Sequence, residues 1–330
     1  MLYEVMRVSV LMPCHNAQSY VSEAIDSVLA QDHRDVELVI VDDGSSDKSL
    51  DVISQYKSDN LVVIQTDNRG ASAARNRALD ASSGGYVIFM DADDIISPSH
   101  VSALLSLSSG HHDIVMGQWD RFCYRIDEAK FPWRPTYRDA LGPDWLIGGG
   151  WGMMQSAMFL LPRVHVDRFG GWNEALSLID DFEFYCRMIA NCNSLRFASG
   201  AKVFYRSGIP NSLSSRRSRF YAEGALVSLL EGTNSVLSVL NTELARSACA
   251  DVFQHFEYEF YPNYPDLRAF ARERVVKLGG SHLRPDGPLY FQIIRRLAGW
   301  RTARRIQRFA EAKRLNLAVL NGALRRTPTV

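Results

Sequence analysis

The sequence predicts an α/β fold, with a mostly parallel, doubly wound sheet followed by a C-terminal helical region. Over its first part, short apolar runs alternate with helical patterns about every 25 residues, which is typical of βα units. Each run ends in polar or acidic residues, and from about Arg219 onward only helical patterns remain. We therefore expect a large domain over residues 1–216, with halves at about 1–97 and 98–216, and a helical region over 217–330.

The first half alternates regularly. Val21, Ala24, Ile25 and Val28 recur at helical spacing after the first apolar run, which gives a first β-α unit. Such short apolar runs are typical of strands buried in a parallel sheet. The expected elements are strands at 8–12, 36–41, 61–65 and 86–90 and helices at 20–31, 48–56 and 71–81.

The second half is less regular. Residues 127–155 are rich in Pro and Gly and predict a long loop with one short helix near 139–147. A helix that begins at Pro162 is expected to stop at Gly170–Gly171, and Asp180–Asp181 begins the next. The other expected elements are a helix at 98–107 and strands at 113–119, 121–126, 156–161, 195–199 and 202–205.

Composition and charge limit the class of protein to which this chain can belong. The chain is 46% hydrophobic and 22% charged, as in an ordinary globular protein. Its formal net charge is zero, but residues 290–330 carry ten Arg or Lys and one acid, so the rest is acidic. An acidic body argues against nucleic acid as a partner. Five cysteines without a C-x-x-C pair, and no apolar run long enough to span a bilayer, predict a cytoplasmic protein.

Acidic residues follow the fourth expected strand, where Asp91, Asp93 and Asp94 come directly after an apolar run. Carboxyl ends of parallel strands meet at one edge of the sheet, where ligands bind in open α/β folds. Two carboxylates at D-x-D spacing can bind one hard divalent cation, which readily carries phosphates. The alternative is that these acids only cap a helix. The ends of the other three strands, at His15–Asn16, Asp42–Asp43 and Asn68–Arg69, should converge on the same edge.

Five segments together resemble the family 2 glycosyltransferases of GT-A fold, in order and at ordinary spacing from Val8 to Ser214. They are V-S-V-L-M-P-C-H-N (8–16), E-L-V-I-V-D-D-G-S-S-D (37–47), N-R-G-A-S-A-A-R-N (68–76), V-I-F-M-D-A-D-D (87–94) and G-G-W-N-E-A-L-S-L-I-D-D-F-E-F (170–184). The resemblance implies an inverting, metal-dependent transfer of a sugar from a nucleotide-sugar, with UDP the expected nucleotide, to an acceptor hydroxyl. It also implies a role in bacterial surface polysaccharide or glycolipid synthesis.

The resemblance assigns roles to individual residues. Asp43 would bind the nucleobase, His15 would stack on it, and Arg75 would lie near the nucleotide. Asp93 and Asp91 would bind Mn²⁺ or Mg²⁺, and Asp181 would be the general base, paired with Asp180. The complete set expected to contact the nucleotide-sugar is Pro13, His15, Asn16, Asp42, Asp43, Asn68, Arg75, Asp91 and Ala92.

Two residues depart from the family pattern. Asp180 stands where relatives carry Glu, and is one methylene shorter. Tyr205–Arg206 is followed by Ser207–Gly208, whereas many relatives have a His there that completes the metal site. Metal dependence could then be weaker, or water could fill the position. A subunit that binds a nucleotide-sugar without turnover remains the alternative function.

The acceptor would be a saccharide or a lipid-linked molecule. Gly148 to Trp151 has the backbone freedom and aromatic face of an acceptor loop, so Trp151 and Met153 are candidate acceptor contacts; the alternative is a simple turn. In the tail, apolar residues from Ile306 to Leu324 share one helical face among arginines. This face is expected to pack against the large domain or a second subunit, with peripheral contact to an anionic membrane as the alternative.

Overall fold

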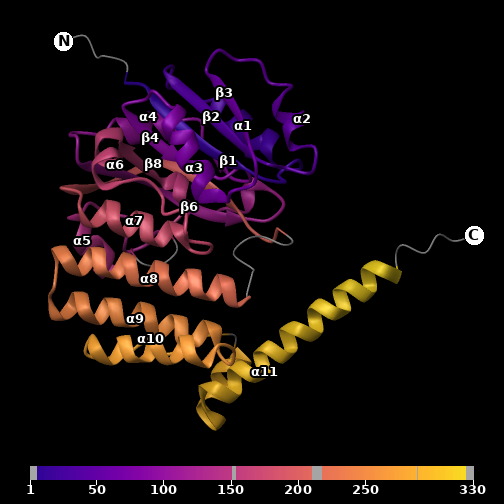
Figure 1. The fold of residues 1–330 in the computed structure, drawn as a ribbon, viewed down its shortest axis with the longest axis vertical. Coiled ribbons are helices and arrows are strands. Elements are labelled where there is room, and N and C mark those ends of the chain that lie inside the picture. Colours follow the sequence, from indigo (N-terminus) through magenta and orange to yellow (C-terminus); the bar gives the residue numbers. More distant parts are fainter. Residues whose placement is uncertain (1–5, 151–153, 210–217, 288, 325–330) are drawn as a thin grey trace, which may run out of the picture. The chain divides into compact units, whose positions relative to one another are not determined.

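The structure is a computed structural model that describes residues 6–150, 154–209, 218–287 and 289–324. It divides into two compact units, residues 1–245 and 246–330. The first unit holds all the strands of the described chain, and the second is helical (Figure 1). The first unit extends past residue 216, the boundary expected from the sequence, because it includes α8 (Arg219–Val239).

The elements alternate as the sequence predicts. Those of the first half are β1 (Val8–Cys14), α1 (Val21–Leu29), β2 (Val36–Asp43), α2 (Ser49–Ile53), β3 (Leu61–Thr66), α3 (Ala71–Ala81) and β4 (Tyr86–Phe89). There follow β5 (Ile95–Ile96), α4 (His100–Leu105), β6 (Asp113–Phe122), α5 (Gly142–Trp145), β7 (Phe159–Pro162), α6 (Arg163–Phe169), α7 (Asp180–Ala190), β8 (Ser194–Arg206) and α8. The remaining helices are α9 (Glu243–Phe260), α10 (Pro265–Lys277) and α11 (Leu289–Leu324).

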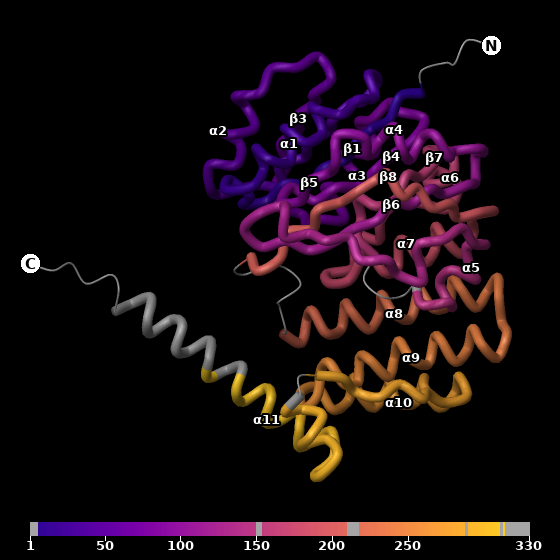
Figure 2. Tube along the Cα trace, turned by 180° about the vertical axis from the view of Figure 1, so that it is seen from behind, coloured from indigo at the N-terminus to yellow at the C-terminus, as the bar shows by residue number. Residues whose placement is uncertain are grey.

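One sheet of eight strands runs through the first unit in the order β3-β2-β1-β4-β7-β6-β8-β5. β1 to β4 are parallel, β6 and β8 are parallel, and the pairs β4–β7, β6–β7 and β5–β8 are antiparallel. β3 and β4 lie on opposite sides of β1, so right-handed crossovers place α3 on the face opposite α1 and α2. Figure 2 shows the same arrangement from behind. The mostly parallel, doubly wound sheet is therefore confirmed.

The core lies where the sheet is covered on both faces. Every residue of β2 is buried, and six of the seven residues of β1 are. This explains why both read as near-continuous apolar runs rather than as alternating ones. β3 is the edge strand, and its Val62 and Val63 remain 38% and 39% exposed.

The strands differ from those expected in four places. β5 was not expected, the 156–161 strand begins only at Phe159, and residues 121–126 do not form a separate strand because β6 ends at Phe122. The two strands expected at 195–199 and 202–205 are the single strand β8. The pairing of β6 with β8 shifts register at Gly117, where a Cβ would lie 2.8 Å from the Ala201 carbonyl oxygen. The irregularity that broke the sequence pattern is thus a β-bulge within a continuous strand.

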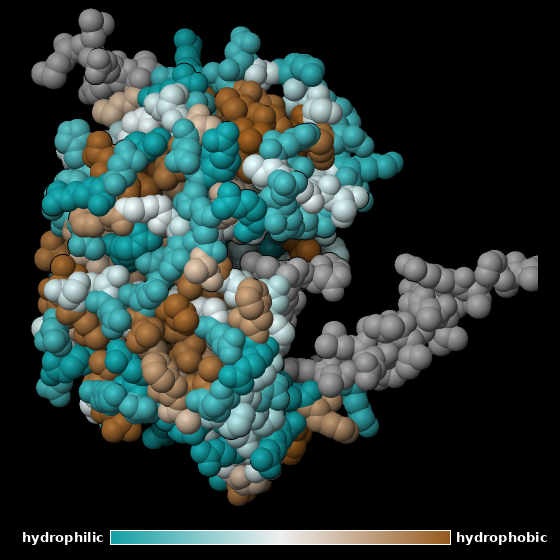
Figure 3. Space-filling model, in the orientation of Figure 1, coloured by the Kyte–Doolittle hydropathy of each residue, from teal (hydrophilic) through white to brown (hydrophobic). Residues whose placement is uncertain are grey.

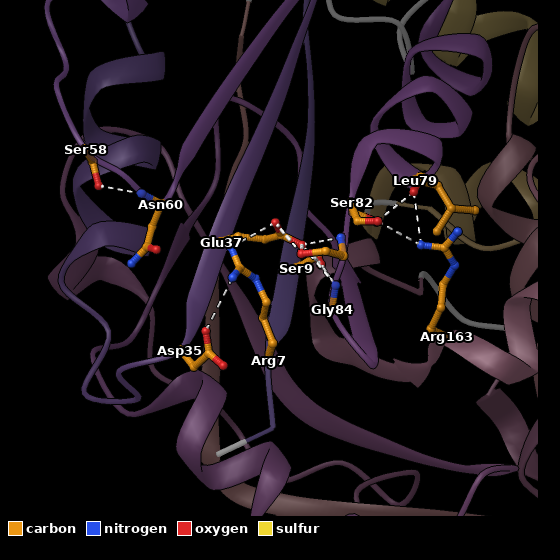
Figure 4. Close-up of polar contacts among 11 residues, drawn as sticks. Arg7, Ser9, Asp35, Glu37, Ser58, Asn60, Leu79, Ser82, Gly84 and Arg163 are labelled. Carbon is orange, nitrogen blue, oxygen red and sulfur yellow. Dashed lines mark hydrogen bonds and ion pairs between the residues drawn. The ribbon is translucent and has the colours of Figure 1, made fainter. Parts of the chain in front are cut away.

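The amino edge of the sheet is tied together by Glu37, which is buried on β2. Its carboxylate accepts hydrogen bonds from the hydroxyl of Ser9 (2.5 Å), from the backbone N–H groups of Ser83 (2.6 Å) and Gly84 (3.0 Å), and from Arg7 (3.2 Å) (Figure 4). Burial alone would raise the pKa of Glu37, but the hydrogen bonds from Ser9 and Ser83 outweigh it and lower the pKa. This cluster joins β1, β2 and the turn before β4.

α8 packs closely on α7. Gly232 allows the approach, since a Cβ there would lie 2.7 Å from the ring of Phe182. The Ser228 hydroxyl donates to the carbonyl oxygen of Ile179, 2.6 Å away, just before α7 begins. α8 is therefore part of the structure that supports the start of α7.

The second unit packs α11 against α9 through aromatic residues. Trp300 lies edge-on to Tyr258 and Tyr261, with ring centroids 4.8 and 5.0 Å apart. Leu297 and Phe309 on α11 remain 83% and 63% exposed. Figure 3 shows separate hydrophobic areas among hydrophilic ones on the face that it presents. Among the described helices, none combines the length and apolar character that crossing a bilayer requires.

Candidate active site

The carboxyl ends of β1, β2 and β4 meet at one edge of the sheet, as expected from their parallel pairing. Cys14 pairs with Asp42 and Leu11 pairs with Phe89, so the residues that follow these strands lie together. His15 Nδ1 lies 2.9 Å from the carbonyl oxygen of Asp43. The predicted convergence of the strand ends is therefore present in the structure.

Asn68 and Asn16 pack beside His15 in different ways. The Asn68 amide nitrogen lies 3.3 Å from both ring nitrogens of His15. Asn16 has a φ of +53°, which Asn tolerates better than most residues. Its Oδ1 accepts hydrogen bonds from the backbone N–H groups of Ser46 (2.8 Å) and Asp47 (3.3 Å). Asn16 thus connects the loops after β1 and β2.

Asp43 anchors the loop after β3. Its two carboxylate oxygens accept hydrogen bonds from the backbone N–H groups of Arg69 and Gly70, each 2.8 Å away. Asp42 is also buried, but its Oδ1 has no hydrogen-bond partner among the described residues. A buried oxygen without a partner is costly, so this atom marks a place where a ligand could donate. Contact of either residue with a nucleobase stays a prediction.

Three acids follow β4 and differ in their surroundings. Asp91 is partly exposed and accepts a hydrogen bond from Arg75. Burial, together with the charge of Asp91, raises the pKa of Asp93 to about 7. Asp94 is completely buried, and burial with the charges of Asp93 and Asp91 raises its pKa as well. Crowded carboxyls of this kind form a region of negative potential at the sheet edge.

Asp94 joins the turn after β4 to two other segments. One carboxylate oxygen accepts from the backbone N–H of Arg206 at 2.9 Å, and the other accepts from the side-chain amide of Gln155. Gln155 also accepts from the backbone N–H of Ala157. Asp94 and Gln155 were not among the predicted site residues, although the third acid of the 91–94 run was a visible signal for Asp94.

Arg206 directly precedes Ser207–Gly208, where the sequence lacks the His expected as a metal ligand. Its Nε donates to the carbonyl oxygen of Asp93 at 2.9 Å, and its guanidinium pairs with Glu23 at 2.7 Å. The next residue, Ser207, donates its N–H to Phe122 at the end of β6. Among residues 6–150, 154–209, 218–287 and 289–324, no group of three His, Cys, Asp or Glu side chains could hold a metal ion.

Asp180 and Asp181 begin α7. Burial and the neighbouring charge of Asp180 raise the pKa of Asp181 to about 7, while Arg75 opposes the shift. Ile179, just before them, has a φ of +49°, which is strained for a β-branched residue. Such strain persists only where the surroundings hold it, and here Ser228 holds the Ile179 carbonyl.

Arg75 links the end of β4 to the start of α7. Its Nη1 lies 2.8 Å from Asp180 Oδ2 and its Nη2 lies 2.8 Å from Asp91 Oδ1. Only 6% of the Arg75 surface is exposed. Its expected contact with the nucleotide stays a prediction, but both terminal nitrogens already have protein partners.

The remaining predicted site residues lie at the same edge or outside the described chain. Pro13 is in β1, and Ala92 is buried between Asp91 and Asp93. The candidate acceptor residues Trp151 and Met153 lie outside the described residues.

Comparison with known proteins identifies related chains. Residues 9–167 match the model of a family described as glycosyl transferase family 2. The chain is 46% identical over 90 residues to the putative teichuronic acid biosynthesis glycosyltransferase TuaG of Bacillus subtilis, covering 26% of this chain and 36% of that protein. It is 35% identical over 120 residues to the poly(ribitol-phosphate) beta-glucosyltransferase of Bacillus spizizenii, covering 34% and 19%.

A solved structure shares the fold. The crystal structure of S. aureus TarS 1–349 in complex with UDP-GlcNAc aligns over 92% of both chains, with a TM-score of 0.60 and 19% identity. The GT-A fold is thereby confirmed. The sequence matches span between 17% and 58% of the lengths of the curated relatives.

Proposed function

Because residues 9–167 belong to glycosyltransferase family 2, we propose that this chain transfers a sugar, with inversion, from a nucleotide-sugar to an acceptor hydroxyl. The observation that carries the proposal is the carboxyl group of Asp181. It opens α7 next to Asp180, whose ion pair with Arg75 leads to Asp91 at the carboxyl edge of the sheet. We take these contacts as support for one site that uses both Asp181 and the acids after β4.

Asp181 is suited to act as the general base. An inverting displacement needs a group that removes the acceptor proton as the acceptor oxygen attacks. A base works best when its pKa lies near the working pH, and the pKa of Asp181 is raised to about 7. The carboxylate of Asp181 can therefore accept a proton near neutral pH.

We assign the donor site to the carboxyl ends of β1 to β4. We assign nucleobase contact to Asp42, whose Oδ1 has no partner among the described residues, and to the ring of His15, which lies beside Asn68. UDP is the first nucleotide to test, because UDP-GlcNAc is bound by TarS, which has the same fold. The proposed nucleotide contacts remain Pro13, His15, Asn16, Asp42, Asp43, Asn68, Asp91 and Ala92.

Asp91 and Asp93 are the residues that would hold a divalent cation. Carboxylate oxygens are the donors that Mn²⁺ and Mg²⁺ prefer. Burial is the main cause of the raised pKa of Asp93, and the charge of Asp91, which adds to it, is one that a cation would offset. When bound, the cation would neutralise charge on the departing diphosphate. Among the described residues no group of three His, Cys, Asp or Glu side chains could hold the ion, so we propose either that water completes the coordination or that metal dependence is weak.

The relatives suggest the acceptor class. Teichuronic acid and poly(ribitol phosphate) appear in the names of two of them, so we propose an acceptor from bacterial polysaccharide synthesis, either a saccharide or a lipid-linked one. Trp151 and Met153 remain the proposed acceptor contacts. A cytoplasmic enzyme, with or without peripheral contact to the membrane, fits this role.

The test is release of nucleotide from a panel of UDP-sugars with Mn²⁺, with and without acceptor preparations from the native host. Wild type should turn over, whereas Asp181→Asn should bind UDP equally well and lose about 10² to 10⁴ in kcat. If both proteins bind UDP and neither turns over with any preparation, the chain is instead a binding subunit.

A further inference from the structure

We propose that Arg75 is a positioning residue that fixes the start of α7 to the end of β4, and that Asp180 is its partner rather than a second reacting acid. The inference rests on the proposed function, in which Asp181 is the base. It changes the role expected for Arg75 from nucleotide contact to alignment of the site.

The guanidinium of Arg75 joins three elements. Arg75 lies on α3, Asp91 follows β4, and Asp180 is the first residue of α7. The two hydrogen bonds to these acids are each 2.8 Å long and come from different terminal nitrogens. A planar guanidinium holds two carboxylates at a fixed separation and angle, which a lysine ammonium cannot do. One side chain thereby spans the end of β4 and the start of α7.

A second contact restrains Arg75 from one side. Its Cζ lies 4.3 Å from the ring centroid of Trp172. Trp172 is itself fixed to α3, because its N–H donates to Asn76 Oδ1 (2.8 Å) and its carbonyl accepts from Asn76 Nδ2 (2.9 Å). Gly171 permits this docking, since a Cβ there would lie 2.5 Å from Asn76 Oδ1. The segment that leads into α7 is therefore held along α3.

Asp180 takes part in the same arrangement through one carboxylate oxygen. Its Oδ2 accepts from Arg75 Nη1 and also from the Ser72 hydroxyl at 2.7 Å. These two contacts hold the Asp180 carboxylate against α3 and assign it a structural task. Asp181, one residue later, accepts from the adjacent Phe182 N–H at 2.9 Å. The two acids at the start of α7 thus have separate roles.

The charges around Asp181 make the proposal testable. Asp180 and Asp91 raise its pKa, and Arg75 lowers it. The phenol of Tyr185, one turn along α7, is a further titratable group nearby: burial raises its pKa, and the charge of Asp181 adds to the shift. Removing the Arg75 charge and removing the Asp180 charge should therefore shift Asp181 in opposite directions.

The experiment measures UDP release from UDP-GlcNAc as a function of pH for Arg75→Gln, Arg75→Lys and Asp180→Asn. In Arg75→Gln the rising limb of kcat should move to higher pH, and in Asp180→Asn to lower pH. Arg75→Lys keeps the positive charge, so the rising limb of kcat should stay near its wild-type pH. It loses the two-pronged contact of the guanidinium, so kcat should fall roughly a hundredfold with a smaller change in KM. Loss of stability alone would not produce shifts of opposite sign.

Arg163→Gln is the matched control. Arg163 is also partly buried and donates to the carbonyl oxygens of Leu79 (3.1 Å) and Ser82 (3.3 Å), but at the opposite edge of the sheet (Figure 4). This variant should lower stability without moving the pH profile. If it shifts the profile as Arg75→Gln does, the proposed role of Arg75 is wrong.

A second measurement needs no turnover. The difference in unfolding free energy between each protein and its Asp181→Asn partner levels off above the pKa of Asp181 in the folded state. The pH at which it levels off should rise in Arg75→Gln and fall in Asp180→Asn. If Arg75→Gln does not fold, Asp180→Asn and Arg75→Lys decide the matter.

The outcomes separate the two proposals. Opposite shifts in a protein that releases no UDP from any donor support the positioning role and reject the proposed function. An active wild type whose variants all keep the wild-type pH profile and leveling point rejects the positioning role alone.

Discussion

The carboxylate of Asp94 accepts a hydrogen bond from the backbone N–H of Arg206, 2.9 Å away, and so ties the acidic turn after β4 to the end of β8. Its other oxygen accepts a hydrogen bond from the side-chain amide of Gln155, which lies between α5 and β7. Both partners are donors, and Asp94 is completely buried. The geometry of the donor site thus depends on an acid that need not touch the substrate.

Asp94→Asn should destabilise the protein by about 1–3 kcal/mol, because an amide has one oxygen for two buried donors. Urea denaturation should show a lower midpoint with an unchanged m-value. The control is Asp127→Asn, which loses only an exposed ion pair with Arg125 and should change stability by less than about 1 kcal/mol. Equal stability of the two variants would contradict the role of Asp94.

The pH dependence of activity should follow Asp181. Its pKa is raised to about 7, so the carboxylate form that accepts a proton becomes scarcer as pH falls below 7. We expect kcat to fall about tenfold per pH unit below this value and to level off above it. Stability should respond in the opposite sense: a raised pKa stabilises the folded state at low pH, and this contribution is lost as pH rises through about 7. A pH–rate profile flat from pH 5 to 8 would exclude Asp181 as the base.

Asp93→Ala should abolish the dependence of UDP binding on Mn²⁺. The change removes one of the two carboxylates proposed to hold the cation. Calorimetric titration with UDP, with and without Mn²⁺, checks this directly. Asp127→Ala is the surface control and should bind as wild type does; Mn²⁺-dependent binding that survives in Asp93→Ala would refute the metal assignment.

Gly84→Ala should destabilise the protein by about 1–3 kcal/mol, whereas Gly85→Ala should have little effect. A Cβ on Gly84 would lie 2.8 Å from the Ser9 backbone nitrogen, while nothing lies within 4 Å of a Cβ on Gly85. The two adjacent glycines form a matched pair. Thermal unfolding of both variants measures the difference. Similar midpoints would show that the turn beside Glu37 accommodates a Cβ without loss of stability.

The tail can be tested for membrane contact by co-sedimentation with anionic liposomes. Residues 290–330 carry ten Arg or Lys, and Leu297 and Phe309 are exposed on α11. Membrane contact predicts that full-length protein sediments more than protein lacking residues 290–330, and that salt weakens the effect. Equal recovery in the supernatant would leave packing against protein as the use of this face.

The sequence was sufficient for the sheet because β1 and β2 are near-continuous apolar runs and polar residues, His15–Asn16 and Asp42–Asp43, lie at their carboxyl ends. Parallel pairing then forces His15, Asp42 and Asp91 to a common edge. It was insufficient where tertiary contacts override local pattern. β8 reads as two strands because its residues 198–201 bulge out of the pairing opposite Gly117 of β6, and β5 has only two residues, too few for any pattern.

The candidate site, like the sheet, was predictable from the sequence only in part. Residue types indicated which acids matter, but the partners of each acid come from distant parts of the chain. Arg75 and Asp180 are 105 residues apart in the sequence, and Asp94 and Arg206 are 112 apart. No local sequence pattern could therefore predict either contact. Asp94 in particular looked like one more acid in a run, and its complete burial gives it a different role.

The Glu37 cluster at the amino edge separates two kinds of mutational effect in space. Its residues hold β1, β2 and the turn before β4 together at the end of the sheet away from the acids. In a library of single substitutions, changes around Ser9, Glu37 and Gly84 should reduce the amount of protein in the cell while leaving the specific activity of the surviving molecules intact. Changes around Asp91 and Asp181 should do the reverse, so a comparison of abundance with activity would map the two edges.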